Sequence, residues 1–83
     1  MPISATPLTV IGADWCPDCQ RTKAFLANQS IEYEWIDVDT NPEAATLVEN
    51  LNAGNRTIPT VIFSDGTHLA EPSNDELVLK LGL

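Results

Sequence analysis

The chain is short and strongly acidic. Its 83 residues carry a net charge of −8 and 43% of them are hydrophobic, which fits a single globular domain over residues 1–83. The negative charge disfavours nucleic acid and anionic membranes as partners, and no stretch reaches the roughly 20 apolar residues of a membrane span. Because Met1 to Ala5 lack the basic and apolar regions of a signal peptide, we expect a cytoplasmic protein, and at this size a monomer.

The first half of the chain predicts a strand, a helix and a second strand. Residues 8–11 are apolar and β-branched, as in a buried strand. A proline then suits the first turn of a helix over about residues 17–28, with Leu26 on the same stripe as Cys19. In residues 31–38 glutamates alternate with apolar side chains, which is typical of a half-solvated or edge strand.

A second helix is predicted after a turn that contains Asp37 and Asp39. Thr40 and Glu43 have the spacing of a capping box, and Asn41 is an alternative N-cap. An apolar stripe at helical spacing follows, formed by Ala44, Leu47, Val48 and Leu51. A glycine at position 54 predicts the end of this helix.

The last part of the chain predicts a hairpin and a helix. Residues 60–63 and 67–70 read as strands, joined by the turn signal Asp65-Gly66. Ser73 and Glu76 make a capping box for a final helix. The predicted inward face of this helix carries Leu77, Val78 and Leu81. The order is β-α-β-α-β-β-α, an α/β chain whose first two strands are parallel and joined by a right-handed crossover.

Cys16 and Cys19 carry the chemistry, because they lie where the first strand gives way to a helix. Unpaired N–H groups and the dipole at a helix N-terminus favour an anion, and the thiolate is the reactive form of cysteine. Cys19 lies one turn further on, close enough to attack a mixed disulfide on Cys16. A bridge between them would close a tiny loop and stabilise little. We therefore interpret Cys16 as a redox nucleophile, expected to be exposed, and Cys19 as a shielded resolving thiol.

A metal site is the main alternative for this cysteine pair. A structural zinc site normally needs about four ligands, and His68 is the only other soft or imidazole ligand in the chain. A complete site within one chain is therefore disfavoured, and His68 is interpreted as a solvated residue. An iron–sulfur-binding or scaffold module, in which two chains share a cluster, stays open as a function of another class.

The tripeptide Thr57-Ile58-Pro59 precedes the predicted third strand. Together with the cysteine pair and the strand order, it resembles the thioredoxin superfamily in its minimal glutaredoxin form. The resemblance implies a thioredoxin/glutaredoxin fold, with a four-stranded mixed sheet and flanking helices. It also implies that Pro59 is a cis proline beside the cysteines, and that the backbone of Ile58 pairs with the peptide-like part of a substrate thiol.

More narrowly, the chain resembles the mycoredoxins, the glutaredoxin-like proteins of actinobacteria that use mycothiol. The resemblance rests on Trp15-Cys16, Arg21, Lys23, residues 54–61 and residues 65–73. It implies an enzyme that reduces mixed disulfides between mycothiol and proteins or small substrates. Mycothiol would be the reducing co-substrate, and no cofactor would be bound.

Some departures from related families bear on the choice of thiol. Asp18 stands where glutaredoxin-like motifs usually carry tyrosine. Ala13 and Asp14 replace the lysine that glutathione-using members place before the motif, and Ser64-Asp65-Gly66 replaces their Gly-Gly pair. Mycothiol is therefore favoured over glutathione. A redoxin that donates electrons to ribonucleotide reductase is a further alternative, although the chain lacks the Trp-Ser-Gly-Phe-Arg-Pro run of those proteins.

Further candidate binding residues lie near the cysteine motif. Trp15 is expected to be partly exposed beside the nucleophile, as a platform for substrate. Arg21, Lys23 and Arg56 are three of the four basic residues, and all lie on elements that adjoin the cysteine end of the predicted sheet. We expect Arg56, with Lys23 and the neighbouring Thr57, to mark a docking surface for polar thiol sugars or acidic partners.

Overall fold

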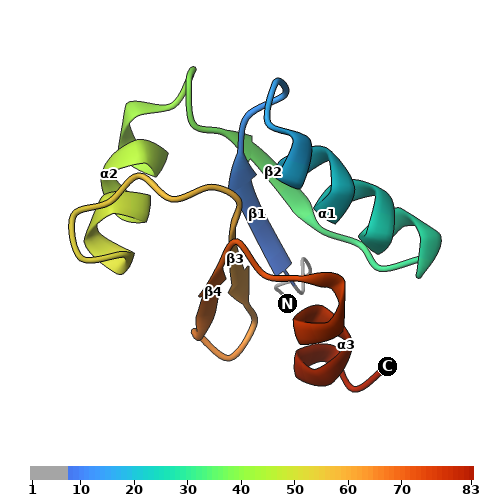
Figure 1. Cartoon of the computed structure of the whole chain (residues 1–83). Helices are drawn as coiled ribbons and strands as arrows, with labels where there is room; N and C mark the ends of the chain where they lie inside the picture. Colours follow the sequence, from blue (N-terminus) through green and yellow to red (C-terminus); the bar gives the residue numbers. More distant parts are fainter. Residues whose placement is uncertain (1–7) are drawn as a thin grey trace, which may run out of the picture.

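The strands form one mixed sheet in the computed structural model, which describes residues 8–83. They are β1 (Leu8–Gly12), β2 (Glu34–Asp37), β3 (Thr60–Phe63) and β4 (His68–Ala70), and their order in the sheet is β2-β1-β3-β4. β1 pairs in parallel with β2 and antiparallel with β3, and β3 pairs antiparallel with β4. The predicted order of elements and the mixed sheet are confirmed (Figure 1).

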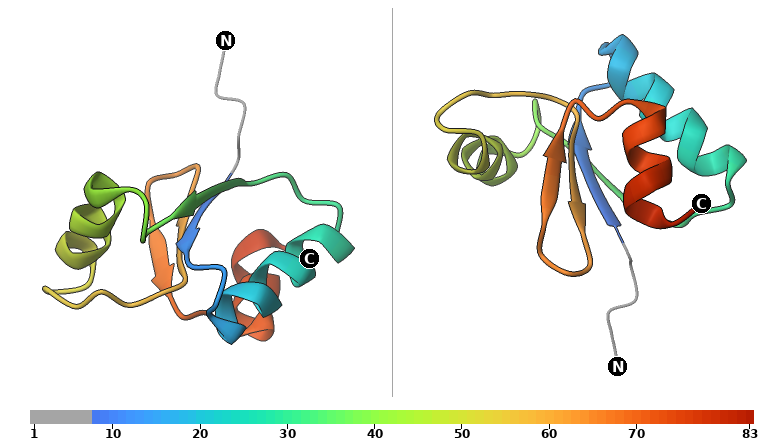
Figure 2. Two further views of the ribbon diagram at one scale, coloured as in Figure 1. Left: turned by 90° about the horizontal axis from the view of Figure 1, so that it is seen from above. Right: turned by 60° about the horizontal axis from the view of Figure 1, so that its bottom comes forward.

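The helices cover both faces of this sheet. They are α1 (Pro17–Asn28), α2 (Pro42–Leu51) and α3 (Asn74–Leu81). α2 lies alone on one face, whereas α1 and α3 lie side by side on the other (Figures 1 and 2). No helix within residues 8–83 is both long enough and apolar enough to cross a membrane.

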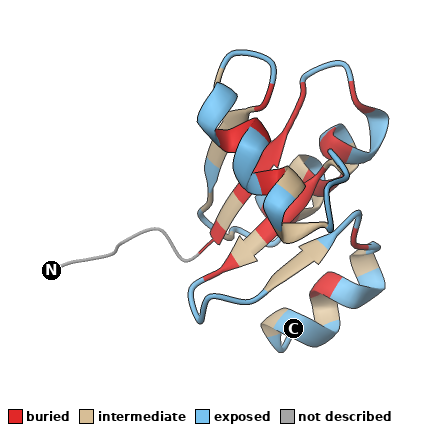
Figure 3. Cartoon of the chain, turned by 90° about the vertical axis from the view of Figure 1, so that its left-hand side faces the viewer, coloured by how far each residue is buried: buried red, intermediate tan, exposed pale blue. Residues whose placement is uncertain are grey.

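Alternation along β1 divides the core between the two faces. Val10 belongs to a buried cluster with Leu26 of α1 and Leu77 of α3, and the next residue, Ile11, belongs to a second cluster with Val48 of α2. Successive strand side chains point to opposite faces, so one central strand supplies both cores. Figure 3 shows this buried strand running between the layers.

Side chains fix the starts of α2 and α3. The Oδ1 atom of Asn41 accepts a hydrogen bond from the N–H of Ala44 at 3.0 Å, so Asn41, rather than Thr40, is the N-cap of α2. Both hydrogen bonds of the capping box between Ser73 and Glu76 are present at the start of α3. A lost cap of this kind typically costs about 1 kcal/mol of stability.

The second strand is shorter than the predicted residues 31–38. The N–H of Ile31 donates to the carbonyl of Leu26 at 2.9 Å, so Ile31 belongs to the turn that ends α1. Pairing with β1 begins only at Glu34. The alternating pattern indicates a half-solvated or edge strand, and β2 lies at an edge of the sheet.

Other differences are local. Thr67 lies in the hairpin turn, where its N–H and hydroxyl both donate to Oδ1 of Asp65, so β4 begins one residue later than predicted. Leu47, which belongs to the predicted apolar stripe of α2, is 42% exposed, whereas Ala44 and Val48 of the same stripe are buried. In α3 only Leu77 is fully buried, and Val78 and Leu81 are half-buried.

Candidate active site

Cys16 is the N-cap residue of α1. Its backbone is extended, Pro17 follows at the first helical position, and its Sγ atom accepts a hydrogen bond from the N–H of Cys19 at 3.3 Å. The N–H of Cys16 donates to the carbonyl of Ala13 at 3.2 Å, which folds the preceding loop against the helix. The sulfur thus receives an N–H from the end of the helix where the dipole favours an anion.

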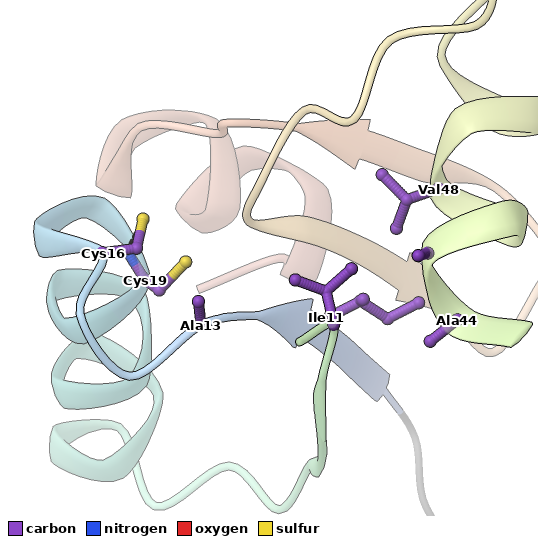
Figure 4. Close-up of a cluster of buried hydrophobic side chains, with 8 residues drawn as sticks. Ile11, Ala13, Cys16, Cys19, Ala44 and Val48 are labelled. Carbon is purple, nitrogen blue, oxygen red and sulfur yellow. Dashed lines mark hydrogen bonds between the residues drawn. The ribbon is translucent and has the colours of Figure 1, made fainter. Parts of the chain in front are cut away.

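The expectation that Cys16 is exposed is wrong. Only 6% of its surface is accessible, because the residue packs within the same buried cluster as Ala13 and Cys19. Figure 4 shows both sulfur atoms beside Ala13, at one end of the cluster that continues to Ile11 and Val48. Cys16 is still the more accessible of the two thiols, since Cys19 has no exposed surface. Neither forms a disulfide.

The two thiols are chemically unequal. Burial, and next the hydrogen bond with the Cys16 side chain, raise the pKa of Cys19 from 9.0 to about 12. Burial disfavours the charged form because a thiolate loses its hydration. Cys19 is therefore a protonated thiol at neutral pH when Cys16 is also reduced.

Gly12 allows the backbone of β1 to pass directly beside Cys19. A Cβ atom at position 12 would lie 2.5 Å from the Sγ atom of Cys19 and 3.0 Å from the ring of Trp35. Side chains cannot approach so closely without a shift of their neighbours. The sequence analysis did not identify Gly12 as a site residue, although a glycine at the end of a strand pattern can signal a close backbone approach.

The segment before β3 packs against the cysteines. The Ile58–Pro59 peptide bond is cis, as the resemblance implied, and Ile58 packs against the cluster that holds both thiols. The carbonyls on either side of Ile58 are already used: that of Thr57 accepts from the hydroxyl of Thr60 at 2.7 Å, and that of Pro59 accepts from the N–H of Glu71 at 2.8 Å.

Trp15 is an exposed aromatic side chain next to Cys16. Its accessible fraction is 68%, and its Nε1–H donates to the Oδ2 atom of Asp39 at 2.8 Å. Asp39 lies in the turn between β2 and α2, where its own N–H donates to the side chain of Asp37. The sequence analysis assigned Asp39 to this turn only, because no local pattern predicts a contact between residues 24 positions apart.

The predicted basic residues are each paired with a carboxylate. Lys23 lies 3.7 Å from Asp14 and 4.0 Å from the centroid of the Trp35 ring. Arg56 makes an ion pair with Glu49 at 3.1 Å. These ion pairs offset part of each positive charge, and the docking role of Arg56 and Lys23 stays a prediction.

Arg21 joins α1 to the start of α3. It donates to the Oδ1 atom of Asn74 at 2.7 Å and to the carbonyl of Pro72 at 3.0 Å, and it lies 3.9 Å from Asp18. These contacts tie the helix that carries the cysteines to the opposite end of the chain. Arg21 therefore has a structural role.

His68 is the remaining candidate metal ligand besides the two cysteines. The imidazole of His68 is half-buried, with Nε2 3.1 Å from the carbonyl of Leu51, so the interpretation as a solvated residue is corrected. Among residues 8–83, no group of three or more His, Cys, Asp or Glu side chains is arranged to hold a metal ion.

Comparisons with known proteins agree with this geometry. A family model described as Glutaredoxin matches residues 8–69. The chain is 43% identical over 74 residues to Mycoredoxin 1 of Corynebacterium glutamicum, which covers 89% of this chain and 91% of that protein. A Mycobacterium tuberculosis protein named as a glutaredoxin is 45% identical over 74 residues, covering 89% and 88%. The structure of the glutaredoxin-like NrdH-redoxin of Escherichia coli aligns with a TM-score of 0.75 at 30% identity, covering 89% of this chain and 92% of that one.

The fold and the cysteine pair at the start of α1 define a thiol–disulfide oxidoreductase with the thioredoxin fold. The chain belongs to the glutaredoxin family, and the predicted similarity to mycoredoxins is confirmed.

Proposed function

We propose that this protein reduces mixed disulfides between mycothiol and proteins or small thiols, with mycothiol as the reducing co-substrate. The observation that carries the proposal is the inequality of the two thiols. The sulfur of Cys16 caps a helix and accepts an N–H, whereas Cys19 is fully buried and has its pKa raised to about 12. The choice of mycothiol rests on the 43% identity with Mycoredoxin 1 over most of both chains.

In the first proposed step, the thiolate of Cys16 attacks the mycothiol sulfur of the mixed disulfide. The bond between the two substrate sulfurs breaks as the Cys16–mycothiol disulfide forms. The substrate leaves as a thiolate and takes a proton from solvent. Before the attack, the backbone N–H of Cys19 donates to the Cys16 sulfur at 3.3 Å and so favours its thiolate. Once the disulfide forms, the sulfur no longer carries the charge that this hydrogen bond stabilises.

In the second proposed step, a second mycothiol thiolate attacks the mycothiol sulfur bound to Cys16. Mycothiol disulfide forms and Cys16 leaves as a thiolate, so the enzyme returns to its starting state without a bound cofactor. Cys19 supplies a second route, in which its thiolate attacks Cys16 and releases mycothiol with an intramolecular disulfide. Because Cys19 has no exposed surface, and burial disfavours the thiolate that this second route needs, we expect the route through mycothiol to predominate.

The remaining proposed site residues bind the thiol. The backbone of Ile58, between two carbonyls that are already occupied, would pair with the peptide-like part of the substrate, with Pro59 beneath it. Trp15 would provide an exposed aromatic surface. Lys23, Arg56 and Thr57 would contribute polar contacts at the periphery.

A redoxin of the NrdH type is a second candidate, supported by 39% identity over 59 residues to the NrdH protein of Escherichia coli, at 70% coverage of this chain. The test is a parallel measurement of kcat/KM for a mycothiol mixed disulfide, for the matching glutathione mixed disulfide, and for reduction by thioredoxin reductase. We expect the mycothiol substrate to be favoured at least tenfold over the other two. Equal or better turnover in either other assay would contradict the proposal.

A further inference from the structure

We infer that Asp39 is a positioning residue that holds the indole of Trp15 as a stacking platform for the sugar part of the thiol substrate. The inference rests on the proposed function for the identity of that thiol. Its structural basis is the 2.8 Å hydrogen bond from Nε1 of Trp15 to Oδ2 of Asp39.

This hydrogen bond determines which part of the indole is available. Nε1–H is the only polar group of the ring, and Asp39 already occupies it. Yet 68% of the Trp15 surface is exposed, so what the ring presents to solvent is chiefly carbon. An exposed apolar ring with its polar edge satisfied suits the C–H faces of a sugar ring, which pack on aromatic faces, and mycothiol carries such amide-linked sugars.

The platform lies within reach of the reaction. Trp15 immediately precedes Cys16, so their Cα atoms are about 3.8 Å apart. A thiol that is disulfide-bonded to Cys16 is therefore attached one residue away from this exposed ring. Thiols without a sugar would make no comparable contact.

Asp39 contributes through preorganisation. A surface tryptophan without a partner samples several rotamers, and substrate must then stop this motion on binding. The backbone N–H of Asp39 donates to the Asp37 carboxylate at 2.8 Å, which stabilises the turn from which the Asp39 side chain projects. The turn between β2 and α2 thus orients a side chain on the cysteine loop, across 24 positions of sequence.

The experiment measures oxidation of the reduced enzyme in single turnover by two disulfides. One is a mycothiol mixed disulfide with 2-mercaptoethanol, and the other is bis(2-hydroxyethyl) disulfide, which has no sugar. We expect Asp39→Ala to raise the half-saturation concentration for the mycothiol substrate about three- to tenfold, with the maximal rate within about twofold. We expect the half-saturation concentration for the sugar-free disulfide to be the same in Asp39→Ala as in the wild type.

Three variants complete the design. Asp39→Asn keeps an acceptor oxygen, so we expect it to retain most of the wild-type affinity for the mycothiol substrate. Asp65→Ala is the matched control, because it removes a turn carboxylate from the β3–β4 hairpin, and it should leave the half-saturation concentration of both disulfides unchanged. In a Trp15→Ala background, Asp39→Ala has no further effect, because the two residues act as one unit. In a Trp35→Phe background, Asp39→Ala lowers the fluorescence anisotropy of Trp15.

The outcomes separate the inference from the proposed function. Equal losses for both disulfides, or additive effects of the Trp15 and Asp39 changes, would overturn the inference and leave Asp39 a structural residue. Absence of any preference for the mycothiol substrate in the wild-type enzyme would refute the proposed function itself, and the sugar-binding role with it.

Discussion

The raised pKa of Cys19 predicts a loss of stability at alkaline pH. The unfolded thiol has an ordinary pKa of 9.0, whereas burial and the Cys16 side chain raise the folded value to about 12. Below pH 9 both states hold the proton, so the stability associated with this group is fully present. As pH rises from 9 towards 12, only the unfolded state releases the proton, and the free energy of unfolding falls by about 1.4 kcal/mol per pH unit.

The expected difference is large enough to measure. Between pH 8.5 and 10.5, integration of this slope gives a loss of about 2 kcal/mol, a substantial part of the stability of a small domain. The assay is urea unfolding of the reduced protein at both pH values, for the wild type and for Cys19→Ser. Serine does not titrate in this range, and the lysines, Tyr33 and Cys16 are common to both proteins, so subtraction leaves Cys19 and its interaction with Cys16.

We expect the stability advantage of the wild type over Cys19→Ser to shrink by about 2 kcal/mol across this pH interval. If the difference between the two proteins were the same at both pH values, the buried thiol would not be held in its protonated form. The argument that Cys19 is a slow resolving group at neutral pH would then lose its basis.

Three further predictions concern neighbouring residues. Gly12→Ala should lower the free energy of unfolding in urea by about 1–3 kcal/mol, because the added Cβ atom would collide with the Cys19 sulfur. The loss should be smaller in a Cys19→Ala background, and equal losses in the two backgrounds would contradict a collision with the sulfur. Asp18→Asn should lower the pKa of Cys19, because the Asp18 charge disfavours a thiolate there; the fall should be small, since that carboxylate is exposed and lies near Arg21. An unchanged or higher pKa in a thiolate absorbance titration, run in a Cys16→Ser background, would refute this reasoning. Ser73→Ala should cost about 1 kcal/mol through loss of the α3 cap, with unchanged activity; a larger activity loss than stability loss would contradict a purely structural role.

Local patterns predicted most of the fold. Pro17 after a strand signal located the start of α1, and the Ser73 and Glu76 spacing located the start of α3. Each of these signals depends on neighbours within one helical turn, which is why the sequence alone reveals them. Leu47 shows the limit of such reasoning, because it shares the apolar stripe of α2 with the buried Ala44 and Val48 and yet is 42% exposed.

The site was predictable only in part. The spacing of Cys16 and Cys19 and the adjacent helix start are local features, and both were identified. The burial of Cys16 depends on packing of its loop within a cluster that residues from α2 complete, and the bond between Trp15 and Asp39 joins two loops that are distant in sequence. Such contacts arise from tertiary structure, so no spacing rule predicts them.

The most direct test of the central claim, that Cys16 alone takes mycothiol from the substrate, is a comparison of Cys16→Ser and Cys19→Ser. Each reduced variant is mixed with a mycothiol mixed disulfide, and adducts are located by peptide mass spectrometry alongside steady-state turnover with mycothiol. We predict a mycothiol adduct on Cys16 in Cys19→Ser, with much of the wild-type turnover retained, and neither adduct nor turnover in Cys16→Ser. Loss of turnover in Cys19→Ser, or an adduct on Cys19 in Cys16→Ser, would contradict the claim.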